Sequence, residues 1–261
     1  MDIIKSKDNK NIKYITKLLS STKFRKQEGR FVTEGVRLCQ EALKNNVSID
    51  MLVYSVSAGD KYIDIIRDLS LKADTTLCVD DRIFCALSDT KTPQGVLCVI
   101  KTLDKQSYFD KIIKNGIIVA LDNIQDPSNL GTILRSADAL GIDGVVLSHD
   151  CCDVFSPKVV RGSMGAVFRI PFVIVDSLSQ YIEHFNENGC SYACVLDKTA
   201  VTVSDVDFDK PVLSVIGNEG NGVSQKVIDA CKSKLYIPMK NNAESLNAAV
   251  AASIIMWEMI K

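Results

Sequence analysis

The sequence predicts an α/β protein built from two domains, and three observations support this. The chain has 261 residues, which exceeds one average domain and falls short of three. Short apolar runs of strand length alternate with segments whose apolar residues recur at helical spacing. A polar stretch, Thr102–Gln106, interrupts this alternation. Since domain boundaries fall in polar linkers, we expect domains at residues 1–104 and 105–261.

The first domain is expected to be a compact α/β unit. Ile12, Ile15 and Leu18 recur at helical spacing with lysines between them, and Gly95–Ile100 is an apolar run typical of a buried strand. The expected elements, in order, are a helix at 10–22, strand Arg30–Thr33, helix Val36–Leu43, strand Ile49–Val56, helix Tyr62–Leu71, strand Thr76–Val79, helix Asp81–Leu87 and strand Gly95–Ile100.

The second domain is expected to be a mostly parallel sheet with helices packed on it. Ile117–Ile124 is an apolar run of strand length, and the DPSN segment stops it because proline cannot continue a central ladder. Apolar residues at helical spacing follow, and Gly141 ends that helix. The other expected elements are a helix at Tyr108–Lys114, strands at Gly144–Leu147, Ala166–Val175, Ser191–Leu196, Val212–Ile216 and Leu235–Pro238, and a C-terminal helix at Ser245–Lys261.

Composition excludes several classes of protein. Hydrophobic residues make up 46% of the chain and charged residues 24%, which is typical of a globular protein and not of a disordered one. No apolar run reaches the ~18 residues of a membrane span, and no signal-peptide core is present, so we expect a cytoplasmic protein. Nine cysteines without a C-x-x-C pair and two histidines favour buried thiols over a metal site or a Ser-His-Asp triad.

The basic residues are concentrated at the N-terminus. Residues 1–30 contain nine basic and three acidic residues, although the whole chain has a formal net charge of −1. Such a segment is typical of a surface that binds phosphates, but a solvated helix with a lysine-rich face explains the charge pattern equally well. Charge alone therefore leaves both interpretations open.

Three loops are candidates for chemistry, because each follows an expected strand at the end where open α/β sheets bind ligands. Asp126–Gly131 leads into a helix whose free N–H groups can hold a phosphate or a ribose. Gly217–Gly222 holds three glycines and one carboxylate, and its glycine spacing matches neither a dinucleotide fingerprint nor a P-loop. Ile237–Asn247 ends a strand and opens an alanine-rich helix. Taken alone, the first loop is better explained as a plain capped helix with a surface arginine, and Glu244 or Ser245 of the third loop as a simple N-terminal cap.

Together these loops resemble the SpoU/TrmH family of RNA 2′-O-ribose methyltransferases. The matching segments are NIQDPSNLGTILRSADALG, VIGNEGNGVS and IPMKNNAESLNAAVAASIIMWE. The stretch NIKYITKLLSSTKFRKQEGRFVTEGVRLCQEAL is similar to the L30e-like substrate-binding domain of many members. The resemblance implies a trefoil knot at the C-terminal end of the second domain, an exception to the rule against knots. It also implies S-adenosyl-L-methionine as cofactor, RNA as substrate, and a homodimer with the active site near its interface.

The resemblance further implies roles for individual residues. Glu219 and Asn129 would orient Arg135 or the ribose, and Ser245 and Asn247 would shape the loop and help to place the hydroxyl. The catalytic positions are thus Asn129, Arg135, Glu219, Ser245 and Asn247. The cofactor-binding positions are Gly217, Asn218, Ile237, Met239 and Leu246. The RNA-binding positions are Lys23, Arg25, Lys26 and Arg30, and no metal is expected.

The expected reaction is attack of a ribose 2′-hydroxyl on the methyl group of the cofactor. The family assigns removal of the hydroxyl proton to the position of Arg135. Because arginine normally stays protonated, the alternative is that Arg135 holds the adjacent phosphate and stabilises the developing alkoxide. The separate L30e-like domain favours 23S ribosomal RNA as substrate, with tRNA as the alternative. A non-catalytic RNA-binding or ribosome-assembly protein on the same fold is a further alternative, and a nucleotide-binding dehydrogenase is remote.

Overall fold

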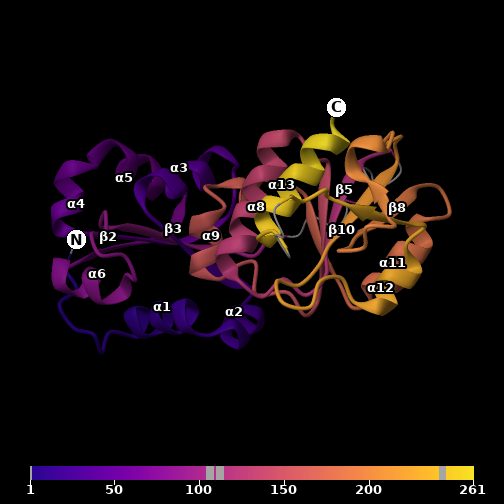
Figure 1. Cartoon of the computed structure of the whole chain (residues 1–261). Coiled ribbons are helices and arrows are strands. Elements are labelled where there is room, and N and C mark those ends of the chain that lie inside the picture. The colour runs from indigo at the N-terminus through magenta and orange to yellow at the C-terminus, as the bar shows by residue number, and fades with distance from the viewer. Residues whose placement is uncertain (1, 104–108, 110–114, 241–244) are drawn as a thin grey trace. The chain divides into compact units, whose positions relative to one another are not determined.

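A computed structural model describes residues 2–103, 109, 115–240 and 245–261 of the chain. The chain divides into two compact units (Figure 1). One contains Met1–Leu103 and Phe155–Phe168, and the other contains Asp104–Val154 and Arg169–Lys261. The domain boundary near residue 104 stays a prediction. The helix expected at Tyr108–Lys114 lies outside the described residues, apart from the buried Phe109.

The first unit is built on a mixed sheet with the strand order β1-β4-β2-β3. β4 (Val96–Lys101) lies between β1 (Arg30–Glu34) and β2 (Ile49–Ser55) and is antiparallel to both. β3 (Ala73–Val79) pairs parallel to β2. Alternate residues of these strands therefore point to opposite faces, and each face needs a layer of helices to cover it.

Two layers of helices cover the two faces of this sheet (Figure 1). α1 (Lys10–Ser20), α2 (Thr22–Glu28) and α6 (Asp81–Leu87) lie on one face, where Ile15, Phe84 and other apolar residues form a buried cluster. The other face carries α3 (Val36–Lys44), α4 (Val56–Lys61) and α5 (Ile63–Ser70).

The single helix expected at 10–22 is two helices, and Ser21 separates them. Ser21 has extended backbone angles, and its hydroxyl accepts a hydrogen bond from the Phe24 amide at 3.2 Å, which caps α2. Periodicity missed this break because the apolar positions of α1 are followed at once by polar residues. A serine that caps a helix from within a polar segment gives no change in hydrophobic pattern.

α9 (Pro157–Gly162) belongs to the first unit although it comes from the second half of the chain. The ring of Phe155 stacks on that of Phe31 with 4.6 Å between centroids, and Arg161 Nη1 lies 3.8 Å from Glu34 Oε2. The strand expected at Ala166–Val175 is wrong in its first part, because α10 (Ala166–Arg169) is helical and the strand begins at Phe172. A short buried apolar run does not distinguish a helix from a strand.

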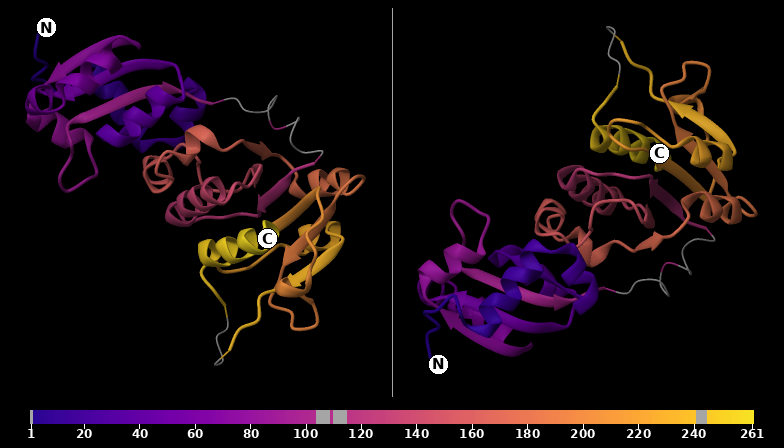
Figure 2. Two further views of the ribbon diagram at one scale, coloured as in Figure 1. Left: turned by 90° about the horizontal axis from the view of Figure 1, so that it is seen from above. Right: turned by 90° about the horizontal axis from the view of Figure 1, so that it is seen from below.

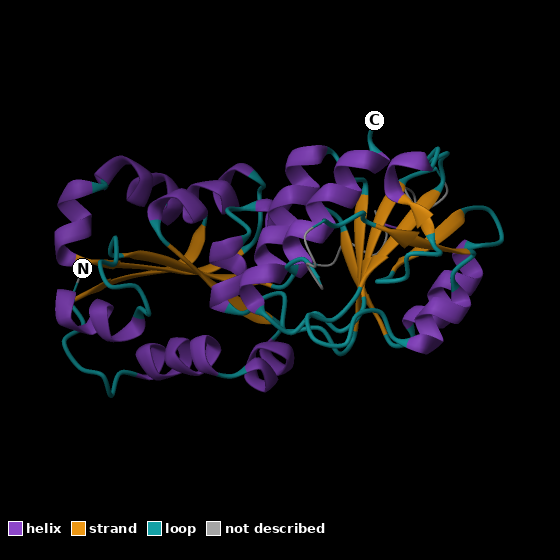
Figure 3. Cartoon of the chain, in the orientation of Figure 1, coloured by secondary structure: helices purple, strands orange, loops and turns teal. Residues whose placement is uncertain are grey.

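The second unit contains a seven-stranded sheet with the order β7-β6-β5-β10-β8-β11-β9, and every pair in it is parallel (Figure 3). Three adjacent strands, β6, β5 and β10, are buried at every residue, as expected for a parallel sheet covered on both faces. The strands are β5 (Ile117–Leu121), β6 (Gly144–Ser148), β7 (Phe172–Val175), β8 (Cys190–Cys194), β9 (Val201–Thr202), β10 (Val212–Ile216) and β11 (Ser233–Tyr236).

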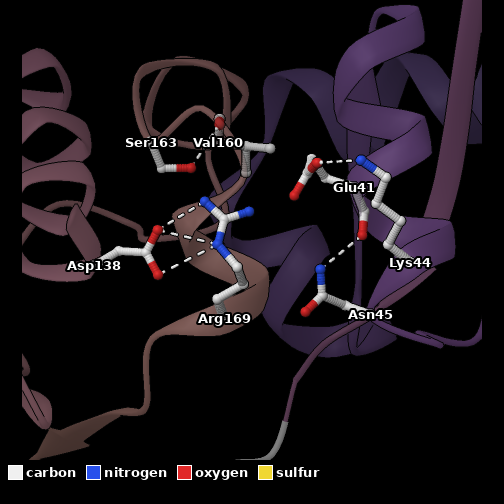
Figure 4. Close-up of polar contacts among 7 residues, drawn as sticks. All are labelled: Glu41, Lys44, Asn45, Asp138, Val160, Ser163 and Arg169. Carbon is white, nitrogen blue, oxygen red and sulfur yellow. Dashed lines mark hydrogen bonds and ion pairs between the residues drawn. The ribbon is translucent and has the colours of Figure 1, made fainter. Parts of the chain in front are cut away.

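Helices cover both faces of this second sheet. α8 (Pro127–Leu140) and α13 (Ala248–Met259) lie side by side on one face (Figure 2), and α11 (Leu178–Phe185) and α12 (Gln225–Ala230) pack on the other. Arg169 forms a two-pronged ion pair with Asp138 of α8, with its Nη2 2.7 Å from Oδ2 and its Nε 3.0 Å from the same oxygen (Figure 4). The trefoil knot concerns a chain path that includes residues 241–244, which lie outside the described residues.

Candidate functional site

Loops from four neighbouring strands meet at one edge of the second sheet. Because β5, β10, β8 and β11 are parallel and adjacent, their carboxyl ends lie along the same edge. The loop after β10 contacts the loop after β5 directly, since Asn218 Nδ2 donates to the Asn123 carbonyl at 2.8 Å. Asp122 also bridges them, because its carboxylate accepts a hydrogen bond from the Ser224 amide at 2.8 Å. The first two candidate loops therefore form one structure.

A cavity of about 480 Å³ opens at this edge. The five residues expected to bind the cofactor all line it: Gly217, Asn218, Ile237, Met239 and Leu246. Two of the expected catalytic residues, Glu219 and Ser245, also line it. Sequence analysis missed Cys194, Val195 and Leu196, which form the wall at the end of β8. The end of the expected strand Ser191–Leu196 could have indicated these residues. Sequence alone does not show that this strand lies beside β10, because that depends on the order of strands in the sheet.

Gly217 is required by the path of its own loop. A Cβ at this position would collide with the backbone of Gly222 and Val223. The loop returns across Gly217 because Asn218 and Gly222 exchange two backbone hydrogen bonds, of 3.0 and 2.9 Å. The side chain of Asn218 braces the same turn by accepting from the Gly220 and Asn221 amides at 3.0 Å each. A glycine here is thus explained by close backbone packing, and Asn218 has a structural task within the loop.

Glu219 connects the loop after β10 to the start of α8. Its Oε1 accepts hydrogen bonds from the Asp126 amide at 3.0 Å and from Asn129 Nδ2 at 2.9 Å, and its Oε2 accepts one from the Gln125 amide at 3.1 Å. A carboxylate suits this position because the N-terminus of a helix offers free N–H groups and a partial positive charge. Burial raises the pKa of Glu219, but these three hydrogen bonds outweigh burial and hold the pKa below its ordinary value of 4.5.

Asn129 extends this contact to the third loop. Its Oδ1 accepts a hydrogen bond from Asn247 Nδ2 at 2.9 Å, and its side chain is buried, with 7% exposed. Asn247 in turn caps α13, because its Oδ1 accepts from the amides of Ala249 and Val250 at 2.9 and 3.3 Å. Glu219, Asn129 and Asn247 therefore form one hydrogen-bonded chain, which we call the polar relay. It joins residues that are about 90 and 118 positions apart in sequence.

Arg135 stands apart from the polar relay. It lies on α8 six residues after Asn129, which places the two side chains about 120° apart around the helix axis. Its side chain is exposed and makes no hydrogen bond or ion pair with any residue in the described part of the chain. An exposed guanidinium can hold a phosphate from outside the unit. The five expected catalytic residues thus divide into the three of the polar relay, Ser245 at the cavity, and Arg135 on the surface.

The thiol of Cys194, at the wall of the cavity, lies in surroundings that favour its neutral form. Burial raises the pKa of its thiol to about 11, so it stays protonated and neutral near pH 7. The pKa of Cys152, whose environment includes the negative charge of Glu219, is raised to about 12, chiefly by burial. Within the described residues no group of three or more His, Cys, Asp or Glu side chains could hold a metal ion.

The four residues expected to bind RNA have different surroundings. Lys23 and Lys26 are exposed on α2. Arg25 is buried, with 4% exposed, and its Nη1 donates to the Leu18 carbonyl at 2.6 Å. It therefore holds the carboxyl end of α1. Burial contradicts the expectation that Arg25 contacts RNA. Arg30 forms an ion pair with Asp50 and donates to the Glu28 carbonyl at 2.7 Å.

The donor set of the cavity fits S-adenosylmethionine better than a nucleotide phosphate. Among the lining residues that the structure describes there is no lysine or arginine, and the one carboxylate is Glu219. The carboxylate of Glu219 would repel a phosphate and attract a sulfonium cation. Apolar side chains from Ile237 and Leu246 suit the face of an adenine ring, and the backbone of the Gly217–Gly222 loop offers polar groups.

Comparison with protein families identifies both parts of the chain. Residues 116–257 match the model of the SpoU rRNA Methylase family, and residues 9–98 match the model of the MRM3-like substrate binding domain. Within the regions of the chain that the structure describes, no helix has the length and apolar character needed to cross a membrane.

Three similar proteins match almost end to end. The 23S rRNA (guanosine(2553)-2′-O)-methyltransferase RlmP of Bacillus subtilis strain 168 is 30% identical over 259 residues, which is 99% of each chain. The AdoMet-bound rRNA methyltransferase of Sinorhizobium meliloti has a TM-score of 0.87 and 28% identity, over 99% of this chain and 97% of that one. The SpoU methyltransferase AviRb of Streptomyces viridochromogenes, solved with AdoMet, has a TM-score of 0.84 and 30% identity over 97% of both chains. This chain therefore belongs to the SpoU family and is an S-adenosylmethionine-dependent RNA 2′-O-methyltransferase with an MRM3-like substrate-binding domain.

Proposed function

We propose that the protein methylates a ribose 2′-hydroxyl in ribosomal RNA of the large subunit. The observation that carries this proposal is the end-to-end match, N-terminal domain included, to a protein named as a 23S rRNA 2′-O-methyltransferase. A match confined to the catalytic domain would support the reaction without bearing on the substrate. tRNA is the alternative substrate, and a cytoplasmic location goes with either RNA.

The cofactor, when bound, supplies an electrophilic methyl group on a sulfonium ion. The protein has to align the ribose oxygen with that methyl group, and alignment alone is worth ~7–11 kcal/mol of the barrier. The polar relay does this indirectly. By joining Glu219, Asn129 and Asn247, it holds the Gly217–Gly222 loop at a fixed distance from the first turns of α8 and α13. Glu219 is a positioning residue in this scheme, because its carboxylate already accepts three hydrogen bonds.

Arg135 is proposed to act on the RNA. Its exposed guanidinium would hold the phosphate beside the target ribose and stabilise the negative charge that develops on the 2′-oxygen. Ser245, which lines the cavity, would lie at its mouth and help to place the hydroxyl. The Arg135→Lys variant tests the electrostatic role. If Arg135 acts electrostatically, the lysine variant should keep part of the activity and show an unchanged pH–rate profile. If Arg135 acts as a general base, the substitution should shift that profile.

We also propose that the active form is a homodimer that covers the exposed face of α13. This helix carries a single charged residue, Glu258, so both its sides are apolar. One side is buried against its own unit, and on the other Val250 and Trp257 are 48% and 54% exposed. A second cavity of about 450 Å³ between α8 and α13 runs from Asn129 and Asn247 to this exposed face. A second copy seated there would shield the apolar surface and lie beside the polar relay.

The dimer has a direct test. Sedimentation analysis of the wild-type protein is expected to give twice the chain mass, and Trp257→Glu is expected to give the monomer. Lys261→Glu, at the exposed end of the same segment, is the control and should leave the dimer intact. A wild-type protein that sediments as a monomer at micromolar concentration would refute the proposal.

The test of substrate is methyl transfer from labelled S-adenosylmethionine to RNA from a strain that lacks this gene, fractionated into ribosomal RNA and tRNA. We expect label in large-subunit ribosomal RNA, recovered as an alkali-resistant 2′-O-methyl dinucleotide. Label in the tRNA fraction alone would replace the proposed substrate by the alternative. Arg135→Ala is expected to abolish turnover while the dissociation constant of the cofactor stays within about twofold of wild type.

A further inference from the structure

The two helical layers of the first unit differ strongly in charge. The layer of α1, α2 and α6 carries seven basic and two acidic residues. α3, α4 and α5, on the opposite face of the sheet, carry four of each. In this second layer charges pair within helices, with Lys44 bound to Glu41 at 3.2 Å and Arg67 to Asp64 at 3.1 Å. Figure 1 shows these two layers on opposite sides of the sheet, so the unit has one basic face and one nearly neutral face.

A groove of about 430 Å³ lies on the basic face, between α1 and α6. Lys7, Lys13 and Lys17 line it, and its described lining contains no acidic side chain. Ile12, Ile83 and Leu87 form an apolar floor, and all three are buried. Three lysines above an apolar floor combine charges for phosphates with a surface for the face of a sugar or base.

The charges of these lysines are available to a ligand. Lys13 contacts Asp8 at 2.7 Å, but Asp8 is highly exposed, and an exposed pair of this kind contributes little. Lys17 Nζ lies 5.7 Å from the centre of the Phe24 ring of α2. α2 also carries Lys23 and Lys26, which are exposed. Arg25 supports this arrangement from inside by binding the carbonyl groups at the end of α1.

We propose that the groove between α1 and α6, lined by Lys7, Lys13 and Lys17, binds the phosphate backbone of the RNA substrate. This inference rests on the proposed function and adds to it the face of the substrate-binding domain that meets RNA. Lysines act as point charges that neutralise phosphates without reading sequence, so the groove contributes affinity and orientation while base recognition lies elsewhere. An acidic protein segment would also find complementary charge here, but the chain acts on RNA, and RNA supplies phosphates at regular spacing.

Two triple variants of the full-length protein test the proposal. The groove variant is Lys7→Ala, Lys13→Ala and Lys17→Ala. The matched control is Lys44→Ala, Lys61→Ala and Lys72→Ala, which removes the same charge from exposed lysines on or beside the α3–α5 layer. Binding of deproteinised large-subunit ribosomal RNA, taken from a strain that lacks this gene, is measured at several salt concentrations. Cofactor affinity and the thermal midpoint serve as folding controls.

Log K for RNA binding falls as log salt rises, and each lost phosphate contact makes this slope shallower by ~0.7–0.9. With three lysines removed, the slope of the groove variant should be shallower by about two to three units. Extrapolated from ~1 M to ~0.15 M salt, a slope change of about 2.1–2.7 corresponds to roughly 50- to 170-fold weaker binding. The control variant should stay within about twofold of wild type. Equal slopes and affinities for the two variants would overturn the proposal and leave the groove to a protein partner.

The outcome is separable from that of the proposed function. Failure of the proposed function would appear in the wild-type protein, as no methyl transfer to ribosomal RNA. Failure of the groove proposal would appear as an active wild-type enzyme whose RNA affinity does not depend on these three lysines. A groove variant with unchanged kcat and a raised KM for RNA would confirm that the lysines bind substrate and take no part in methyl transfer.

Discussion

Replacing Asn129 by Asp places a second carboxylate in the polar relay. The Asn129 amide nitrogen now lies 2.9 Å from Glu219 Oε1, and the substitution puts an oxygen there. With charge centres ~4 Å apart, the repulsion is about 4 kcal/mol at the effective dielectric constant of ~20 that suits such sites. The lost hydrogen bond to a charged acceptor adds about 1.5–3 kcal/mol. Asn129→Ala loses this bond and the bond from Asn247 without any repulsion, for a cost of about 2–4.5 kcal/mol.

Acidification distinguishes the two variants. Near pH 5 a single proton shared by the introduced carboxylate and Glu219 replaces the repulsion by an O–H···O hydrogen bond, because two close carboxyl groups titrate as a pair with one raised pKa. We therefore expect Asn129→Asp to be less stable than Asn129→Ala at pH 7.5 and to recover most of the difference at pH 5. Glu219→Gln in the Asn129→Asp background should restore part of the stability at pH 7.5.

The assay follows the fluorescence of Trp257 during thermal unfolding. This is the single tryptophan of the chain, and it lies on α13, which Asn247 of the polar relay caps. Each kcal/mol corresponds to ~2–4 °C for a unit of this size, so the two variants should differ by several degrees at pH 7.5. Equal midpoints for Asn129→Asp and Asn129→Ala at both pH values would refute the adjacency of Asn129 and Glu219.

Three further predictions follow from the same contacts. Gly217→Ala forces the loop open, because its Cβ would meet the backbone of Gly222 and Val223, so cofactor affinity should fall at least tenfold in a calorimetric titration. Gly220→Ala is the control and should stay near wild type, because its Cβ would make only an ordinary contact of 3.6 Å with the side chain of Asn218. Arg25→Ala removes the hydrogen bonds to the Leu18 and Leu19 carbonyl groups, so it should lower the free energy of unfolding by about 3 kcal/mol and leave the salt dependence of RNA binding unchanged. Lys26→Ala, at an exposed position, should leave the thermal midpoint unchanged and reduce the salt dependence of RNA binding. The pKa of Glu219 is lowered in the folded protein, so its contribution to stability is present above pH 4.5 and is lost as the pH falls through the lower, folded-state pKa. Between pH 5 and pH 3 the wild-type protein should therefore lose more stability than Glu219→Gln. Parallel curves of stability against pH for the two proteins would contradict this.

The five residues expected to bind the cofactor line one cavity because each lies in a loop that follows a parallel strand. Gly217, Ile237 and Leu246 are far apart in the chain, yet their loops share one edge of the sheet once the strands are parallel. The strand at Ala166 was wrong, since a short buried apolar run is compatible with either element. Arg25 was assigned to the surface because charge counting does not reveal burial, and its place depends on a turn at Ser21 that leaves no trace in hydrophobic periodicity.

The sequence by itself determined the alternation of elements, the order of the three loops and the family, since these depend on local spacing and on motifs within single segments. The tertiary structure decided which loops touch. It joined Glu219 to Asn129 and Asn129 to Asn247, it separated Arg135 from them, and it placed Phe155–Phe168 with the first unit. It also separated the basic residues of α1 and α2, since Lys13 and Lys17 line a groove whereas Arg25 is buried. The physical reason is that strand order, helix rotation and burial depend on contacts between distant segments, and periodicity within one segment carries no information about them.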